Sequence, residues 1–185
     1  MSAKKVINGM KDRKLTGIEL GRALVEEYSE LPSSGIVVVM DNIRSAHNVG
    51  SVFRTSDAFK VDRRFLCGIC ACPPTAEIHK SALGAEMSVP WEYASDTMDV
   101  ISRLKSEGYT VISAEQTENA VQLQDFTPEV HGRYAIVFGN EVDGVRQDVV
   151  DASDFAVEIP QYGTKHSLNV SVSAGIVLWQ IRRHR

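Results

Sequence analysis

The segment IPQYGTKHSLNVSVSAGIVLW, from Ile159 to Trp179, decides how the C-terminal part of this chain folds. It starts where a predicted strand ends in Ile-Pro, continues through a glycine-containing loop, and enters the last predicted helix at Ser167. Ser167 can cap this helix, and Asn169 lies in its first turn, where free backbone N–H groups attract negative charge. Because an ordinary core needs neither polar side chain there, the segment indicates a small ligand bound against the loop.

Strands alternate with helices along the rest of the chain. Apolar runs predict strands at residues 36–40, 64–71, 89–93, 109–114, 134–139 and 155–159. Amphipathic patterns and capping signals predict helices at residues 17–28, 49–59, 75–83, 95–107, 145–151 and 167–183. This alternation predicts an α/β fold with a mainly parallel sheet and helices on both faces.

Three polar stretches follow strands of the predicted sheet. They are DNIRSAHNVGSVFRTSDAF at 41–59, FGNEVDG at 138–144 and IPQYGTKHSLN at 159–169. Ligands bind beyond the carboxyl ends of parallel strands, so we expect the three stretches to meet in one site. The candidate functional residues within them are Asn48, Arg54, Glu141, Ser167 and Asn169.

Each candidate also has an ordinary explanation. Asn48 and Ser167 can be helix caps, Arg54 can form a surface ion pair, and Glu141 can simply belong to a turn between two glycines. Their shared position at one end of one sheet favours the functional interpretation.

Fingerprints of several common enzyme classes are absent from the sequence. Neither the G-x-G-x-x-G of dinucleotide-binding folds nor the G-x-x-x-x-G-K-[ST] of P-loop proteins occurs, and G-x-S-x-G is also missing. A hydrolase built from Ser167, His166 and Glu141 is disfavoured, because adjacent side chains at a helix start diverge.

The composition is that of one globular domain, since 43% of the 185 residues are hydrophobic. The net charge of −4 argues against a surface coated with nucleic acid but allows a local basic patch. Positive residues gather near both ends of the chain, as Lys4, Lys5, Lys11, Arg13, Lys14, Arg182, Arg183 and Arg185. They are either solvated termini or phosphate contacts.

Three cysteines, Cys67, Cys70 and Cys72, lie in one short run. A zinc site needs four ligands, and only a poorly spaced His79 is available as the fourth, so buried thiols with Cys67 on the opposite face are favoured over a metal. No apolar run approaches the length of a membrane span, and the N-terminus lacks a signal-peptide core. A cytoplasmic protein without metal or membrane contact is therefore expected.

The three stretches together resemble the motifs of the SpoU (TrmH-like) branch of the SPOUT RNA methyltransferases. Asn48 to Thr55 resembles the family's N-x-G-x-x-x-R run, Ile136 to Gly144 resembles V-x-G-x-E-x-x-G, and Ile159 to Val172 resembles I-P…S-L-N-V-S-x-A. Lys80 to Ala85 also resembles a family segment. The likeness runs from about Gly35 to Trp179, so a methyltransferase domain is expected at 35–185 after a short basic and helical extension at 1–34.

The resemblance implies a fold that the residue patterns alone do not predict. In this family the C-terminal segment threads through a loop to form a deep trefoil knot, an exception among protein chains. The knot forms an S-adenosylmethionine pocket, and the proteins act as homodimers. The positions implied to bind the cofactor are Ala114, Phe138, Gly139, Asn140, Glu141, Gly144, Ile159, Pro160, Gln161, Gly163, Ser167 and Leu168.

The reaction implied by the resemblance is methyl transfer to a ribose 2′-hydroxyl of tRNA or rRNA, which depends mainly on alignment of the reacting groups. Arg54 is then the candidate activator or base, although a guanidinium does not readily lose its proton and can instead hold a phosphate. Asn48 and Glu141 would position Arg54 and the substrate, and Ser167 and Asn169 would contact the substrate or hold the pocket loop.

Several residues depart from the family's usual pattern, including Asn140, Val142, Gln161 and Ser173. They leave intact the catalytic residues that the resemblance implies, and they do not assign the chain to one subfamily. Without a separate N-terminal RNA-binding domain, RNA capture would rest on the basic termini, Arg44, His47 and the dimer groove. The choice between tRNA and rRNA stays open, with a slight preference for tRNA. A knotted RNA-binding module without catalysis and a different nucleotide-dependent α/β enzyme remain as alternatives.

Overall fold

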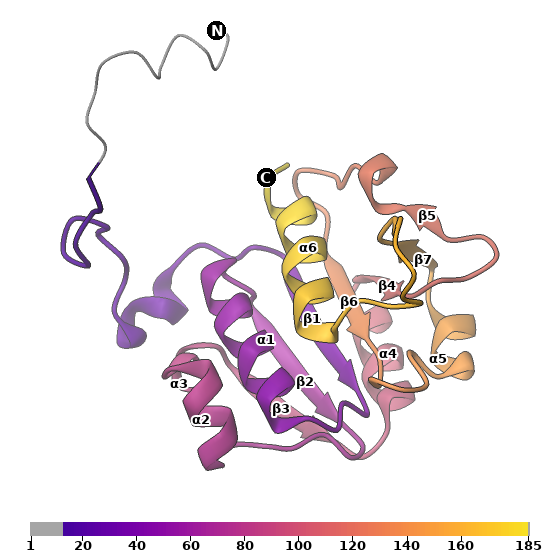
Figure 1. The fold of residues 1–185 in the computed structure, drawn as a ribbon, viewed down its shortest axis with the longest axis horizontal. Coiled ribbons are helices and arrows are strands. Elements are labelled where there is room, and N and C mark those ends of the chain that lie inside the picture. Colours follow the sequence, from indigo (N-terminus) through magenta and orange to yellow (C-terminus); the bar gives the residue numbers. More distant parts are fainter. Residues whose placement is uncertain (1–12, 185) are drawn as a thin grey trace, which may run out of the picture.

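The computed structural model describes residues 13–184, which are built around one seven-stranded sheet (Figure 1). The strands are β1 (Ile36–Asp41), β2 (Arg63–Cys67), β3 (Trp91–Ala94), β4 (Thr110–Ala114), β5 (Val121–Gln122), β6 (Tyr134–Phe138) and β7 (Phe155–Glu158). Their order across the sheet is β3-β2-β1-β6-β4-β7-β5, and the pairings between these strands are parallel. The predicted α/β class with a mainly parallel sheet is confirmed.

Helices cover both faces of the sheet, as predicted. α1 (Ala46–Ala58), α2 (Ala76–Ala82), α3 (Ala85–Ser88) and α6 (Val170–Arg182) pack on one face, and α4 (Thr97–Ser106) and α5 (Gln147–Ala152) pack on the other. Alternate residues of β1 point to opposite sides, so Val38 joins the core under α1 and α6, whereas Val39 joins the core under α4. Every residue of β1 is buried, which is typical of a central strand in a parallel sheet.

The α1–α2 contact depends on a glycine. A β-carbon at Gly50 would lie closer than 3.0 Å to the backbone oxygen of Ile78 on α2. The absence of a side chain therefore lets the two helices approach closely.

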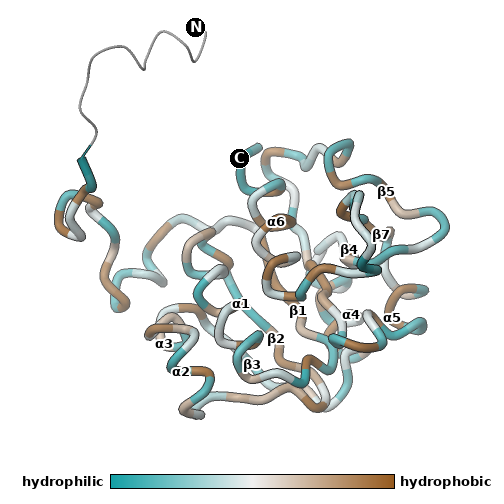
Figure 2. The backbone as a smooth tube through the Cα atoms, in the orientation of Figure 1, coloured by the Kyte–Doolittle hydropathy of each residue, from teal (hydrophilic) through white to brown (hydrophobic). Residues whose placement is uncertain are grey.

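α6 lies beside α1 over the middle of the sheet (Figure 1). Its apolar residues and its polar C-terminal end are seen in Figure 2. Val177 belongs to the core, whereas Ile176 and Trp179 are 37% and 58% exposed. Within residues 13–184, no helix is both long and apolar enough to cross a membrane.

The helix predicted at 17–28 is wrong. The predicted capping residues do interact, because the backbone N–H of Thr16 donates to a carboxylate oxygen of Glu19 at 2.8 Å. The turn ends at Gly21, which has a φ of +55°, and Ile18 is 94% exposed. An isolated turn without apolar packing does not propagate into a helix, and only the short 3₁₀ helix η2 (Val25–Glu30) forms.

The boundaries of other predicted elements also change, and the helix predicted at 49–59, for example, begins at Ala46. The strand predicted at 64–71 ends at Cys67, because Gly68 takes a left-handed φ of +61°. The last helix, predicted to begin at 167, begins at Val170. The short α3, β5 and the 3₁₀ helix η3 (Leu123–Asp125) were not predicted, since each is too short to leave a periodic signal.

Part of the predicted N-terminal extension packs against the rest of the described structure. Tyr28 is buried, and its hydroxyl donates to the backbone oxygen of Val61 at 3.0 Å. The predicted basic residues Lys4, Lys5 and Lys11, as well as Arg185, lie outside the described residues.

The prediction of buried strand thiols is confirmed in part, because Cys67 and Cys70 are buried, whereas Cys72 is half-buried and β2 ends at Cys67. Cys67 and Cys70 are buried in the cores on opposite faces of the sheet, and burial raises the pKa of each thiol to about 12. The Cys70 thiol also donates to the backbone oxygen of Met40 at 3.2 Å. Among residues 13–184, no cluster of three or more histidine, cysteine, aspartate or glutamate side chains could hold a metal ion.

Candidate functional site

The three predicted stretches meet at the carboxyl edge of the sheet, where β1, β6, β4 and β7 are neighbours. A cavity of about 470 Å³ lies there, between the segments that follow β4, β6 and β7 and the start of α6. Ten of the twelve predicted cofactor positions line it, namely Ala114, Phe138, Gly139, Asn140, Glu141, Gly144, Ile159, Gln161, Ser167 and Leu168. Pro160 and Gly163 do not line the cavity.

Glu141 is the centre of a hydrogen-bond network beside this cavity. Its carboxylate accepts from the backbone N–H groups of Arg44 at 2.9 Å and Ser45 at 3.0 Å, and from the side-chain amide of Asn48 at 2.8 Å. Partial burial by itself raises the pKa of Glu141, but the hydrogen bonds from Arg44, Asn48 and Ser45 outweigh it, so the pKa is lowered. The site therefore holds an anion that ties the β6 turn to the β1–α1 loop.

The same network reaches the last helix. Asn169 donates through its side-chain amide to Oδ1 of Asn48 at 3.1 Å, and Asn48 donates in turn to Glu141. Three residues that are distant in the sequence thus form one chain of donors that ends on a carboxylate.

Two expectations about helix caps are corrected here. Asn169, and not Ser167, caps α6, because its Oδ1 accepts from the backbone N–H of Ser171 at 2.9 Å. Ser45, and not Asn48, caps α1. Asn48 is therefore free of the capping role and uses its whole amide in the network, and Ser167 lies in the loop that lines the cavity.

The turn after β6 needs its glycines. A β-carbon at Gly139 would lie closer than 3.0 Å to the backbone of Gly144, and Gly144 itself has a φ of +69°. Asn140 and Gly144 exchange two backbone hydrogen bonds of 2.9 and 3.0 Å, which close the turn. The Asn140 side chain donates to the backbone oxygen of Asn42 at 2.7 Å and accepts from Val142, so this departure from the family pattern serves to hold the turn.

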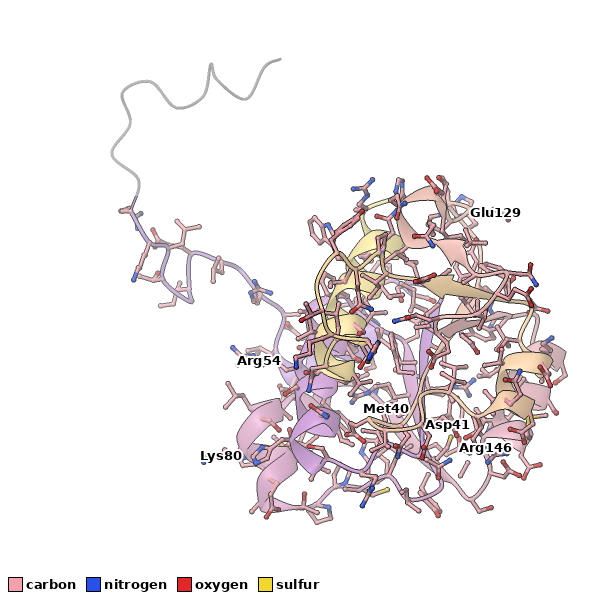
Figure 3. All side chains as sticks on the ribbon, turned by 45° about the vertical axis from the view of Figure 1, so that its right-hand side comes forward. Met40, Asp41, Arg54, Lys80, Glu129 and Arg146 are labelled. Carbon is pink, nitrogen blue, oxygen red and sulfur yellow. The ribbon has the colours of Figure 1, made fainter. Side chains whose placement is uncertain are left out.

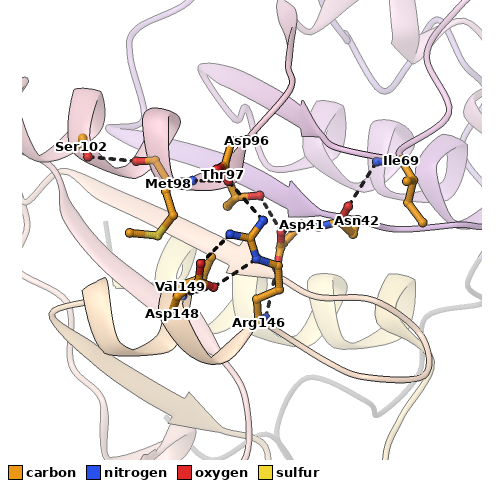
Figure 4. A network of polar contacts seen from close by, with 10 residues as sticks. All are labelled: Asp41, Asn42, Ile69, Asp96, Thr97, Met98, Ser102, Arg146, Asp148 and Val149. Carbon is orange, nitrogen blue, oxygen red and sulfur yellow. Dashed lines mark hydrogen bonds and ion pairs between the residues drawn. The ribbon is translucent and has the colours of Figure 1, made fainter.

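A second polar network, centred on Asp41 and Arg146, supports the segment that follows the turn (Figure 4). Asp41, at the end of β1, is buried and accepts from the hydroxyl of Thr97 and from the backbone N–H of Arg146 at 3.1 Å. The Arg146 guanidinium pairs with Asp96 and Asp148. A buried carboxylate needs hydrogen-bond donors, and Asp41 takes them from Thr97 and Arg146. These contacts join β1 to the start of α4 and to the segment that follows the turn.

Arg54 is not brought into the network. It is exposed on α1, six residues and thus about 9 Å along the helix axis from Asn48, and it does not line the cavity. Among the described residues, its side chain has no hydrogen bond or ion pair, and Figure 3 places it at the surface. Arg44 and His47 are also exposed near the start of α1.

Sequence reasoning missed several residues of the cavity, above all Glu115, Gln116, Asp143 and His166. Glu115 and Gln116 follow the strand predicted at 109–114 directly. The rule that ligands bind beyond carboxyl ends, applied to that strand as well, would have found them.

The sequence of this chain is similar to those of a known protein family. The sequence profile of the SpoU rRNA Methylase family matches residues 35–179. A 23S rRNA (guanosine-2′-O-)-methyltransferase, RlmB, from Neisseria meningitidis serogroup B is 33% identical over 88% of this chain and 62% of its own length.

Two solved structures have the same fold. The TrmH/SpoU tRNA modifying enzyme of A. aeolicus has a TM-score of 0.76 and 27% identity, over 87% of this chain and 80% of that one. The AdoMet-bound rRNA methyltransferase of Sinorhizobium meliloti has a TM-score of 0.77 and 24% identity, over 85% of this chain and 60% of that one. The chain spans less than two thirds of the length of the first curated relatives that it matches. With most of its length matched by the family profile, the chain belongs to the SpoU rRNA methylase family.

Proposed function

We propose that this chain transfers a methyl group from S-adenosylmethionine to a ribose 2′-hydroxyl of rRNA or tRNA. The observation that carries the proposal is the hydrogen-bonded chain from Asn169 through Asn48 to Glu141 beside the cavity. It links one residue from each family motif in a single site. The Neisseria relative is named as a guanosine-2′-O-methyltransferase, which supports the ribose hydroxyl as the acceptor.

The cavity suits S-adenosylmethionine in size and in chemistry. Its volume of about 470 Å³ lies within the range of roughly 300–1,000 Å³ that is usual for such ligands. Apolar side chains, among them Phe138, Ile159 and Leu168, offer a surface for a flat base, and the glycine turn 139–144 exposes backbone groups. When bound, the cofactor would supply an electrophilic methyl group on a sulfonium; the S. meliloti neighbour is described as AdoMet-bound.

Arg54 would bind and orient the RNA. Its guanidinium keeps its proton and carries several N–H donors, so it can hold a phosphate and polarise the hydroxyl of the substrate ribose. The Asn169–Asn48–Glu141 chain would hold the start of α1, and hence Arg54, in a constant position relative to the cavity. Arg44 and His47 are exposed on the same part of the chain and would add phosphate contacts, which position RNA without reading its sequence.

The trefoil knot of the family is part of this proposal. Two contacts support it, since Gln116 donates to the backbone oxygen of His166 at 2.7 Å and Gln180 of α6 donates to that of Phe126 at 3.2 Å. Both link the C-terminal segment to the long β4–β6 connection. The division into an extension at 1–34 and a domain at 35–185 also stays a prediction.

A homodimer is proposed from an exposed apolar stripe on α6. Val172, Ile176 and Trp179 lie four and three residues apart on one side of the helix and are 49%, 37% and 58% exposed. Exposed apolar stripes mark interaction surfaces, and this one lies on a helix that also lines the cavity. This favours a second copy of the chain packed against the stripe.

The test uses methyl-labelled S-adenosylmethionine with separate tRNA and rRNA pools from cells that lack the protein. After digestion, label in 2′-O-methyl nucleosides of one pool supports the proposal and selects the substrate class. Cofactor binding without label in either RNA pool would contradict the proposed methyltransferase activity and favour an RNA-binding module without catalysis. Failure to bind the cofactor would favour a different nucleotide-dependent enzyme.

A further inference from the structure

The walls of the cavity are joined by two residues that belong to no motif, Glu115 and Gln116. Both follow β4 directly, and β4 lies between β6 and β7 in the sheet. A residue that leaves β4 can therefore reach the turn after β6 on one side and the loop after β7 on the other.

Glu115 makes the first of these connections. Its carboxylate accepts from the backbone N–H of Val145 at 2.9 Å and from that of Gln116 at 2.8 Å. It also fills the space over Gly144, since a β-carbon there would clash with the Glu115 carboxylate. The turn after β6 and the backbone of Gln116 are thus held in fixed relation.

Gln116 makes the second connection. Its side-chain amide donates to the backbone oxygen of His166 at 2.7 Å. Residues 162–169 are exposed, and five residues of this loop and its approach line the cavity, namely Gln161, His166, Ser167, Leu168 and Asn169. Between Pro160 and Leu168, this is the one hydrogen bond to the rest of residues 13–184.

Both ends of the loop are anchored independently of Gln116. Ile159 packs against the core, and Val170 is buried at the start of α6, next to the bond from Asn169 to Asn48. Within residues 13–184, the bond from Gln116 is therefore the one hydrogen bond that ties the middle of the loop to the wall of the cavity.

We infer that Gln116 is a positioning residue that holds the 160–168 loop over the cofactor pocket through its hydrogen bond to the His166 carbonyl. Glu115 fixes Gln116 relative to the turn after β6 by accepting hydrogen bonds from the backbone of both segments. The inference rests on the proposed function for the identity of the ligand. Gln116 acts on the cofactor site through the loop, so its loss weakens cofactor binding more than it slows the methyl-transfer step.

Two variants isolate this hydrogen bond. Gln116→Ala removes the donor, and Gln116→Glu keeps the shape but replaces the amide donor by an acceptor. Gln147→Ala is the matched control, because Gln147 is an exposed glutamine on α5 whose amide donates to Asp151, also at 2.7 Å, away from the cavity. Thermal unfolding of each variant checks that the fold is intact.

The first readout is calorimetric titration with S-adenosylmethionine and with S-adenosylhomocysteine. Loss of one neutral hydrogen bond should raise Kd about 3- to 10-fold in both Gln116 variants, with little change in the control. In turnover assays, KM for the cofactor should rise by a similar factor while kcat changes less. Unchanged Kd in both Gln116 variants would overturn the inference.

The second readout needs no cofactor. Lys165 is the only lysine or arginine between Arg146 and Arg182, so trypsin cleavage after Lys165 reports directly on the loop. Cleavage should be faster in both Gln116 variants than in wild type and in the control. Equal cleavage rates would refute the role of Gln116. If wild type fails to bind S-adenosylmethionine, the proposed function fails, and the cleavage rates still decide whether Gln116 holds the loop.

Discussion

The glycine turn after β6 gives the sharpest test of the pocket's construction. Gly139→Ala adds one β-carbon, which would lie closer than 3.0 Å to the backbone of Gly144. Gly139 has no left-handed φ, so alanine meets no conformational penalty there and the clash alone is tested. The neighbouring atoms are backbone, which cannot move aside as a flexible side chain can.

The cost of Gly139→Ala follows from what must move. The turn has to open, which removes some or all of the two Asn140–Gly144 backbone hydrogen bonds, each worth about 0.5–1.5 kcal/mol. Overpacking in a tight site costs about 1–3 kcal/mol more. If both bonds are lost, we expect the free energy of unfolding to fall by about 2–6 kcal/mol and affinity for S-adenosylmethionine to fall in parallel.

Urea unfolding followed by tryptophan fluorescence measures this loss. Gly163→Ala is the control, because nothing lies within 4 Å of its added β-carbon and its φ is also outside the left-handed region. That variant should be unchanged or more stable by up to about 1 kcal/mol. Equal stability of Gly139→Ala and wild type would refute the idea that close backbone packing requires a glycine there.

Three further substitutions test the site and the surface. Arg54→Ala should lower turnover about 100-fold or more while cofactor affinity stays near wild type, and near-normal methylation would reject its assignment. Because the folded-state pKa of Glu141 is lowered, its carboxylate stabilises the fold above the unfolded pKa of about 4.3, and this is lost as pH falls through the folded value. The stability deficit of Glu141→Gln should therefore shrink below about pH 4 in pH-dependent urea titrations, and a pH-independent deficit would contradict this linkage. Trp179→Ser should weaken self-association by about tenfold or more in sedimentation velocity, whereas Val130→Ser, also exposed, should not.

Much of the site could be predicted because its residues follow strands. Asn48, Glu141 and Asn169 were expected at one edge of a parallel sheet, and the structure joins them by hydrogen bonds. Ser167 lines the cavity but does not cap the last helix, and Arg54 stands apart. Their roles in binding and catalysis stay predictions.

The errors have a common physical origin. Capping signals at Thr16 and Ser167 are local, and they state only that a turn can begin there. Whether a helix continues depends on packing, which Ile18 lacks and Val170 has. Asn169 caps α6 through its Oδ1 and also donates to Asn48, 121 residues away in sequence, a contact that no local capping signal predicts.

The α/β class, the parallel sheet and the family could be read from the amino-acid sequence, because apolar periodicity and motif residues are local features of the chain. Tertiary structure alone decided that β4 lies between β6 and β7, and therefore that Glu115 and Gln116 connect two walls of the cavity. Strand order depends on which surfaces can be buried together over long distances in sequence, so no local pattern near residue 115 encodes it.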